Sequence, residues 1–452
     1  MKENLNMASQ PKLKKYRIGV IGTGARGETF ARQLRDGHPR AELFGVCDID
    51  RDRLDTFCSY CELGDTRRFT DSREFLAQSA LDAVVITTPE WTHGDVAVAA
   101  LGAGKHIYLE KPMAHNSESC RQIMRAHAET AKTRPVTAFI GFNLRQTGPF
   151  MRLKEVVDSG VLGQILHVAG LEQVSRAHGA SFMRRFHRNS GRTGGLLNHK
   201  CSHDLDILQW LVGHQHQINK VSSFGGNNVF TPDKQPATHC SVCPVRDDCF
   251  YPDKAGFVFP VGGQQPLHHQ QSDVYGADLC VFNDDKDIVD NQSLIMEWDN
   301  GVRGSFNLQM FQHFGRRQIC IWGETGYAEL NTWPENLVRV VHTGSGEVVE
   351  HRFPPPVGGH GGSDIRMISR FTEAIDDPAA FAARGASSSL AAGLAATLVA
   401  EKADQSRLGG QVVEISPHEF SAGDANPHST RTTGISPPFA LAARNGTILR
   451  TV

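Results

Sequence analysis

Two histidines and an aspartate stand at helical spacing in the stretch GRTGGLLNHKCSHDLDILQWLVG, residues 191–213. His199 and His203 are four residues apart and Asp206 follows three residues later, so on a helix the three side chains project from roughly one face. Imidazole titrates near neutral pH, which suits general acid–base catalysis. The spacing therefore favours a reactive site over the plainer alternative of two core histidines held by hydrogen bonds.

A metal ion is a third interpretation of the same residues, because His-x3-His spacing suits zinc. The zinc-protease pattern has a glutamate directly after its first histidine, and this chain has Lys200 there. A catalytic zinc is therefore the least favoured of the three. The stretch itself is predicted to be a helix, because Leu205, Leu208 and Leu211 recur at helical spacing and Gly213 can end it.

A glycine-rich turn near the start of the chain could hold a dinucleotide. The apolar strand expected at Tyr16–Ile21 runs directly into Gly22, Gly24 and Gly27, and a helical stretch follows. In this context G-x-G-x-x-G lets a pyrophosphate approach a helix N-terminus. A second apolar strand ends in Asp48, about 20 residues beyond the last glycine, where an acid can bind the ribose hydroxyls. The pattern predicts an NAD site.

NADP is the alternative cofactor, because Arg51 and Arg53 follow closely and could bind a 2′-phosphate. Their other interpretation is solvated charge at the start of a helix. The carboxylate of Asp48 favours NAD.

Strands and helices continue to alternate up to PVTAFIGF at 135–142, which predicts a parallel sheet with right-handed crossovers. Ligands of such sheets bind at the carboxyl ends of the strands. One strand here ends in Thr87, Thr88 and Pro89, and another ends in Glu110 and Lys111. The lysine either forms a salt bridge with the glutamate or places a cation beside the nicotinamide, where burial would lower its pKa.

Together these motifs resemble the glucose-fructose oxidoreductase, inositol 2-dehydrogenase and MocA family. The resemblance spans roughly Tyr16 to Ile415 and rests on GTGARG at 22–27, Asp48, TTPEWTH at 87–93, EKP at 110–112, GFNLR at 141–145 and GGLLNHKCSHDLD at 194–206. It implies an α/β protein: an N-terminal Rossmann domain, then an α/β domain with a large, mostly antiparallel open sheet. It also implies hydride transfer between NAD(P) and a carbinol carbon of a sugar, sugar acid or cyclitol.

The motifs and the resemblance together assign roles to residues. Lys111, His203 and His199 are the expected catalytic group. The expected cofactor contacts are Gly22, Thr23, Gly24, Ala25, Arg26, Gly27, Asp48, Thr87, Thr88, Pro89, His93, Glu110 and Lys111. The expected substrate contacts are Asn143, Arg145, Lys200, Asp206 and His360, although the glycines around His360 could equally mark a mobile loop.

One position departs from the family pattern. The inositol dehydrogenase type has an aspartate four residues before the helix histidine, and this chain has His199 there. An imidazole changes which hydroxyls can be bound and which group takes the proton, so the substrate of that type does not carry over. The preceding loop is basic, with Arg184, Arg185 and His187; it is either a solvated face or a binding surface for an acidic sugar or a phosphate.

Cysteines cluster in a long segment of low periodicity. Cys240, Cys243 and Cys249 form C-x2-C-x5-C, and Cys280 could complete four thiolates. We expect a structural zinc in this segment, because it has no core of its own. An iron–sulfur cluster and a set of reduced surface thiols are the alternatives.

The bulk composition narrows the partners. The 452 residues carry a formal net charge of −2, which gives no electrostatic footprint for nucleic acid or an anionic membrane. We expect a cytoplasmic homo-oligomer, a dimer or tetramer, that binds a small carbohydrate-like molecule. The expected organisation is a flexible arm at 1–15, a Rossmann domain at 16–142, a substrate-binding and oligomerisation domain at 143–420 with an insertion at 227–280, and a C-terminal extension at 421–452.

Two other functions compete with the dehydrogenase. One is a glycosidase or lyase of the same fold, in which NAD oxidises a sugar carbon transiently and the hydride returns. The other is a nucleotide-sensing protein without turnover, which the ionisable residues disfavour.

Overall fold

The computed structural model describes residues 14–251, 278–355, 362–383 and 388–423. Nearly all of the arm predicted at 1–15, most of the extension predicted at 421–452, and His360 lie outside the described residues. No helix within the described ranges is long and apolar enough to cross a membrane.

The first sheet is parallel and has the strand order β3-β2-β1-β4-β5-β6. Its strands are β1 (Tyr16–Ile21), β2 (Ala41–Cys47), β3 (Arg67–Phe69), β4 (Ala83–Ile86), β5 (His106–Leu109) and β6 (Ala138–Ile140). The central strands are buried on both faces, as apolar parallel strands require. This confirms the predicted Rossmann domain.

Helices connect these strands: α1 (Ala25–Arg35), α2 (Arg51–Tyr60), α3 (Ser72–Leu76), α4 (Glu90–Gly102) and α5 (Ser117–Ala131). Three of them start at side chains that cap the first turn, because Asp50, Asp71 and Asn116 accept hydrogen bonds from main-chain N–H groups there. The starts of α1 and α4 carry no such cap, and they follow the carboxyl ends of β1 and β4. Their N–H groups are therefore available at the edge where a ligand binds.

The second sheet has nine strands in the order β14-β13-β12-β11-β7-β10-β9-β8-β15. Its strands are β7 (Ile165–Ser175), β8 (Ile218–Gly226), β9 (Asn291–Trp298), β10 (Arg303–Gln312), β11 (Arg316–Gly323), β12 (Gly326–Asn331), β13 (Leu337–His342), β14 (Val348–Arg352) and β15 (Val413–Glu414). All neighbours are antiparallel except β7 and β10. The large, mostly antiparallel sheet was expected, and it is present.

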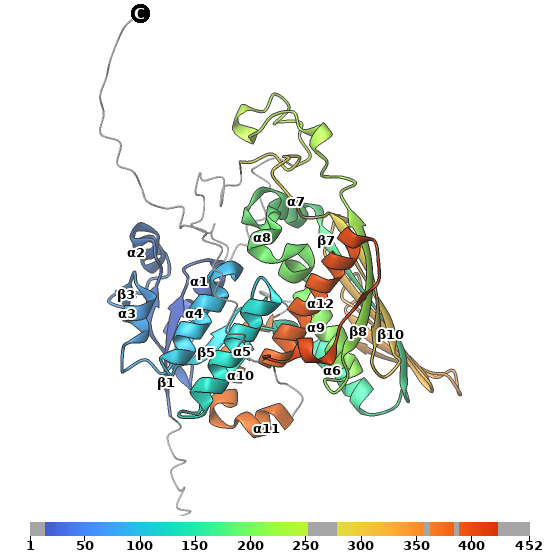
Figure 1. Cartoon of the computed structure of the whole chain (residues 1–452), viewed down its shortest axis with the longest axis horizontal. Coiled ribbons are helices and arrows are strands. Elements are labelled where there is room, and N and C mark those ends of the chain that lie inside the picture. Colours follow the sequence, from blue (N-terminus) through green and yellow to red (C-terminus); the bar gives the residue numbers. More distant parts are fainter. Residues whose placement is uncertain (1–13, 252–277, 356–361, 384–387, 424–452) are drawn as a thin grey trace, which may run out of the picture. The chain divides into compact units, whose positions relative to one another are not determined.

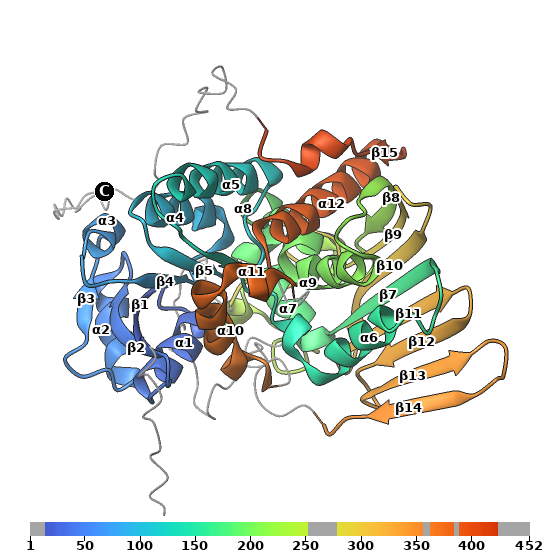
Figure 2. The same ribbon diagram turned by 90° about the horizontal axis from the view of Figure 1, so that it is seen from below.

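The described helices lie on one side of this sheet in both ribbon views (Figures 1 and 2). They include α6 (Gly148–Asp158), α9 (Gly195–Val212) and α12 (Leu390–Gly409). Strands such as β9 alternate buried and more exposed residues, because only one of their faces meets these helices. The histidine-bearing helix α9 is therefore held between the large sheet and the rest of the molecule.

Helix α9 ends where the sequence indicates. Gly194 precedes it with φ of +74°, a conformation that favours glycine, and Gly213 ends it with φ of +121°. Sixteen of its residues are buried, so no side of it faces solvent broadly. Shorter segments lead into it: α7 (Arg176–Arg184), a 3-10 turn at Phe186–Arg188 and α8 (Ser190–Thr193).

Near its end the chain returns to the first domain. The predicted boundary of that domain at residue 142 does not include this late segment. Helix α10 (Asp364–Asp376) and the following α11 (Pro378–Ala383) belong with the core of the first sheet. Met367, Ile368 and Phe371 are fully buried against residues of β1 and β5 such as Ile18 and Tyr108. A late apolar helix whose partner sheet lies over 200 residues earlier cannot be assigned from local periodicity alone.

Candidate active site

The glycine-rich turn after β1 is shaped by two of its three glycines. Gly22 has φ of +99°, and a Cβ there would lie 2.8 Å from the main chain of Thr87. A Cβ on Gly27 would collide with the carbonyl oxygen of Gly22. Gly24 differs, because nothing lies within 4 Å of its Cβ position. Two glycines thus permit close packing of turn, strand and helix, and the third leaves open space at the start of α1.

Asp48 lies beside this turn. Its Oδ2 accepts hydrogen bonds from the main-chain N–H of Thr23 at 2.9 Å and from its hydroxyl at 2.7 Å, while Oδ1 accepts the N–H of Asp50. The carboxylate is therefore fixed beside the glycine-rich turn.

The carboxyl end of β4 lies next to the same turn. The Thr87 hydroxyl donates to the carbonyl of Gly22 at 2.8 Å, and Thr88 accepts from Thr92. His93 has both ring nitrogens within 2.9 Å of main-chain oxygens, those of Thr88 and Pro112. These expected cofactor residues are brought together, with His93 serving to join two strand ends.

Lys111 connects the strand end of the first domain to the histidine helix. Its Nζ donates to the main-chain oxygen of His199 at 2.9 Å. In an α-helix that carbonyl belongs to the turn leading to His203, so the ammonium lies against the turn that carries both histidines. Burial, helped by the nearby charge of Lys200, lowers the pKa of Lys111 to about 8.

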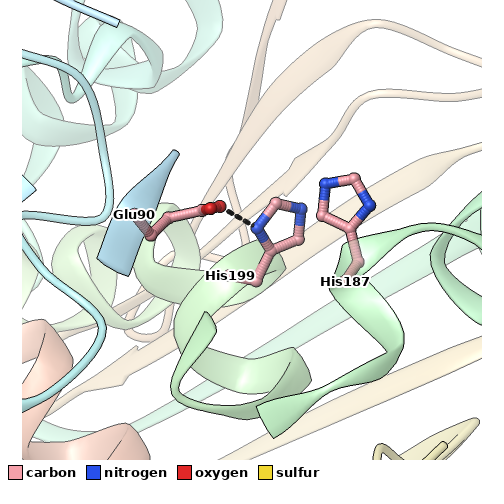
Figure 3. A group of neighbouring side chains, drawn as sticks. All are labelled: Glu90, His187 and His199. Carbon is pink, nitrogen blue, oxygen red and sulfur yellow. Dashed lines mark hydrogen bonds and ion pairs between the residues drawn. The ribbon is translucent and has the colours of Figure 1, made fainter. Parts of the chain in front are cut away.

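Glu90 and His187 join His199 in one group (Figure 3). Nδ1 of His199 and Oε1 of Glu90 form a short hydrogen bond, and the rings of His199 and His187 lie 4.2 Å apart between centroids. Although burial opposes its ionisation, His199 lowers the pKa of the Glu90 carboxyl. Burial lowers the pKa of both imidazoles, that of His187 well below its usual value.

His203 is buried one turn further along α9, with 4% of the residue exposed, and its ring meets Phe142 edge-on at 6.0 Å. Asp206 forms a two-pronged ion pair with Arg145 at 2.6 and 2.7 Å. The side chains of this pair are 1% and 0% exposed. The guanidinium also lies 5.8 Å from the Phe142 ring, so the pair is part of the packing around His203.

Lys200 lies in a second buried charge cluster. Its ammonium is 3.0 Å from Glu172 on β7, which also pairs with Arg317 of β11 at 2.9 Å. Arg317 in turn pairs with Asp204 at 2.8 Å. The cluster fixes α9 to the large sheet. An expected substrate contact thus already has a protein partner.

Three more expected residues also pair within the protein. Arg26 bonds both Glu110 and Asp364, at 2.7 and 2.8 Å. Asn143 donates to Asp364 at 3.1 Å. Of the sequence-derived site residues, Arg26 and Glu110 therefore connect α1, β5 and α10 to one another.

The four cysteines of the predicted metal site line one small pocket together with Arg184 and Arg246. The main-chain bridge between His239 and Leu279 places Cys240 beside Cys280. Burial raises the pKa of the Cys280 thiol, and the neighbouring Cys243 and Cys249 add to this. The sulfurs do not all approach within 4.8 Å, a spacing that among the described residues only the Glu90, His187 and His199 group meets.

Glu90 and His187 are the site residues that the sequence analysis did not select. Glu90 lay inside the TTPEWTH motif, where the threonines and His93 drew attention, and His187 was grouped with a basic loop. Their role depends on contact with His199, which lies 109 residues from Glu90 along the chain. The sequence signal that could have indicated His187 is its position in the loop shortly before the helix that carries His199.

Comparison with known families decides the assignment. Residues 16–139 match the model described as "Oxidoreductase family, NAD-binding Rossmann fold", and residues 150–329 match the "GFO/IDH/MocA C-terminal domain". The chain belongs to the GFO/IDH/MocA family. This member is accordingly an oxidoreductase with an NAD-binding Rossmann domain.

Several named relatives resemble this GFO/IDH/MocA protein. The relative named "Putative oxidoreductase YteT", from Bacillus subtilis, is 25% identical over 358 residues, 72% of this chain and 81% of YteT. The myo-inositol 2-dehydrogenase of Thermotoga maritima is 26% identical over 358 residues, 78% of this chain and 93% of its own length. The scyllo-inositol 2-dehydrogenase (NAD(+)) of Bacillus subtilis is 31% identical, but over only 47% of this chain and 59% of that enzyme.

Solved structures share the fold. Scyllo-inositol dehydrogenase from Lactobacillus casei, with bound NAD(H) and scyllo-inositol, aligns with a TM-score of 0.63 at 20% identity, over 89% of this chain and 99% of that one. Levoglucosan dehydrogenase, in complex with NADH and L-sorbose, aligns with a TM-score of 0.65 at 18% identity, over 89% of this chain and 100% of that one. At these identities the likeness supports the two-domain architecture of this family member.

Proposed function

We propose that this protein uses NAD to oxidise a carbinol carbon of a cyclitol or sugar, or catalyses the reverse reduction. The observation that carries the proposal is the hydrogen bond from Lys111 to the carbonyl of His199, which joins the cofactor domain to the histidine helix. A substrate held at this junction would lie between the carboxyl ends of the parallel strands, where a dinucleotide binds, and a histidine of α9. A dehydrogenase needs an acid–base group at that position, beside the substrate hydroxyl.

His203 is proposed as the principal acid–base group and Lys111 as the cation that polarises the reacting oxygen. When NAD is bound, its nicotinamide ring supplies the hydride acceptor. Removing a hydride from a carbinol carbon requires that the hydroxyl proton leave in concert, and an imidazole has the suitable ordinary pKa near neutrality. The ammonium of Lys111 stabilises the negative charge that develops on that oxygen.

Asp206 is proposed to orient His203 rather than to contact the substrate, and Arg145 fixes Asp206. Their buried two-pronged ion pair leaves the carboxylate little capacity for another ligand. Lys200 and Asn143 remain proposed substrate contacts. Lys200 pairs with Glu172 and Asn143 donates to Asp364, and each side chain can form further hydrogen bonds.

NAD is the proposed cofactor in preference to NADP. Asp48 is fixed at the glycine-rich turn by Thr23, and a carboxylate at that point would repel a 2′-phosphate. The names of the relatives include an NAD(+)-dependent scyllo-inositol dehydrogenase, which supports the same choice.

The substrate class is a ring that carries several hydroxyl groups. Inositol dehydrogenases among the relatives and a levoglucosan dehydrogenase among the structures of like fold support it. A screen of inositols, sugars and sugar acids for net NADH formation tests the proposal. The redox-cycled glycosidase or lyase is the competing outcome, because it would release a sugar from a glycoside without net NADH.

The proposal includes a structural zinc at Cys240, Cys243, Cys249 and Cys280. All four thiols line one pocket, and the flanking Arg184 and Arg246 would favour thiolates. Thiolate donors suit zinc, which would hold the ends of the insertion together once the sulfurs close around it.

We also propose that the protein forms a homo-oligomer through the helix-free face of the large sheet. Phe224 of β8 and Ile295 of β9 are 74% and 64% exposed, and they lie on adjacent strands. A sheet face with large exposed apolar side chains is typical of an interaction surface. Sedimentation or light scattering of wild type and of Phe224→Lys would measure this assembly.

A further inference from the structure

Glu90, His187 and His199 come from three separate segments and lie next to one another. Glu90 is the first residue of α4, His199 lies in α9, and His187 lies in the turn between α7 and α8. Each offers one metal-ligand atom, and the three atoms lie within 4.8 Å of one another. In Figure 3 the ring of His199 stands between the Glu90 carboxyl group and the ring of His187.

Two buried polar atoms in this group lack hydrogen bonds. Oε2 of Glu90 and Nδ1 of His187 have no partner among the described residues. The Glu90 side chain is only 8% exposed. A buried oxygen or nitrogen without a partner costs free energy, and an ion or ordered water is the usual reason for such an atom in a folded protein. A cation held by the Glu90 carboxylate would satisfy Oε2, and the His187 nitrogen that faces His199 in Figure 3 is Nε2 rather than Nδ1.

We propose that Glu90, His187 and His199 bind a divalent transition-metal ion of the zinc class. Two imidazoles and one carboxylate form a donor set of catalytic zinc sites, which keep a fourth position open for water or substrate. Magnesium and calcium prefer oxygen donors and match this set less well. The site differs from the His-x3-His zinc pattern, because His203 is not part of it.

Aromatic rings hold the two histidines in place. Phe182 meets His187 and His199 edge-on, at 5.4 and 5.2 Å between centroids. Phe186 lies 3.9 Å from the His187 ring, and Trp91 packs against Phe186 at 5.1 Å. These aromatic rings restrict the rotation of the two histidine side chains, so that less conformational freedom is lost when a metal binds. They also limit access of water to the site.

The site adjoins the proposed reaction centre, because Lys111 bonds the main chain of His199 itself. A metal there would bind an oxygen of the substrate and lower the pKa of a coordinated hydroxyl. That role rests on the proposed function, whereas binding of the ion does not.

Cobalt(II) titration of the metal-free chain, followed by visible absorption, tests the inference without an activity assay. Cobalt bound to nitrogen and oxygen donors gives d–d bands, and thiolate ligands add charge-transfer bands in the near ultraviolet, so the cysteine pocket is distinguished. We expect two kinds of bound cobalt in the wild type, one with thiolate bands from the cysteine pocket and one without them, and we expect zinc to compete for the second. His187→Gln should weaken cobalt binding at least about 100-fold, because a three-residue set loses one ligand.

His178→Gln is the matched control, because this half-buried histidine packs against Phe182, with 4.6 Å between ring centroids, but is outside the ligand group. It should keep the cobalt spectrum, and thermal unfolding should show both variants to be folded. Glu90→Gln provides a second ligand variant with the same expected loss. Absence of a cobalt site without thiolate bands in wild type, or an equal affinity of that site for cobalt in wild type and both ligand variants, would overturn the metal site. Normal NADH formation in the same metal-free protein would leave the proposed dehydrogenase intact.

Discussion

Arg145 and Asp206 form a two-pronged ion pair, 2.6 Å at its shorter contact, with both side chains almost completely buried. The pair joins the segment after β6 to the centre of α9, one turn from His203. Charges buried in this way contribute little net free energy as a pair, but the loss of one partner leaves the other uncompensated.

We therefore expect Asp206→Asn to lower the free energy of unfolding by about 3–5 kcal/mol in urea titrations. Glu155→Gln is the control, because it removes an exposed ion pair to Arg152 and should have a much smaller effect. The double variant Arg145→Met/Asp206→Leu should recover part of the loss. Similar stabilities for Asp206→Asn and Glu155→Gln would argue against a structural role for the pair.

Cofactor choice follows from Asp48. Wild type should bind NADH more tightly than NADPH, and Asp48→Ala should reduce that preference at least about tenfold by removing the charge that opposes a 2′-phosphate. Dissociation constants for NADH and NADPH, obtained from quenching of protein fluorescence, measure this preference. Asp52→Ala, which removes a carboxylate from the first turn of the following helix α2, is the control. Tighter binding of NADPH by wild type would mean that Arg51 or Arg53 dominates.

The cysteine pocket should contain metal in freshly purified protein. We expect Cys243→Ser to remove about one zinc per chain and to lower the thermal midpoint, since the thiols line a single pocket. Cys320→Ser, which changes a cysteine outside that pocket, should retain the metal. Purified protein that contains neither zinc nor iron, and whose thermal midpoint does not change when a chelator is added, would contradict the site. Brown colour and visible absorption would indicate an iron–sulfur cluster instead of zinc.

His106 should make the fold sensitive to acid. Burial lowers its pKa to about 4, and its Nδ1 accepts the main-chain N–H of Thr137, so the folded state keeps the imidazole neutral. In the unfolded chain the same imidazole binds a proton at about pH 6.5. The contribution of His106 to the free energy of unfolding is therefore fully present above that pH and is lost as the pH falls toward 4, at up to about 1.4 kcal/mol per pH unit.

The variant His106→Asn keeps a hydrogen-bond acceptor but cannot titrate. Its free energy of unfolding should fall less steeply than that of wild type between pH 6.5 and 4, and the two curves should run parallel above pH 7. Identical slopes over the acidic range would show that His106 does not make this contribution.

The sequence was sufficient for those parts of the fold that depend on local pattern. Strand β1 has the predicted bounds, the glycine turn after β1 has the expected geometry, and α9 ends at Gly213. Hairpins at Asn300-Gly301 and Thr325-Gly326 follow from their turn residues. Each of these depends on residues within a few positions of one another.

Long-range pairing was beyond the sequence. Glu90 meets His199, Lys200 meets Glu172, and α10 packs on the first sheet only because distant segments fold together. A single sequence gives the residue types of these partners but not their distances. For this reason the histidine helix was recognised, while Glu90 and His187, the two residues grouped around His199, were not.

The turnover of His203→Ala tests the central claim most directly. With the inositol or sugar that gives the fastest NADH formation, we predict that turnover falls roughly 100-fold or more while NADH binding is unchanged, because a positioned acid–base group is lost. Lys111→Ala should lower turnover and also weaken substrate binding. Near-normal turnover of His203→Ala, with wild-type affinity for NADH, would contradict the assignment of His203 as the acid–base group.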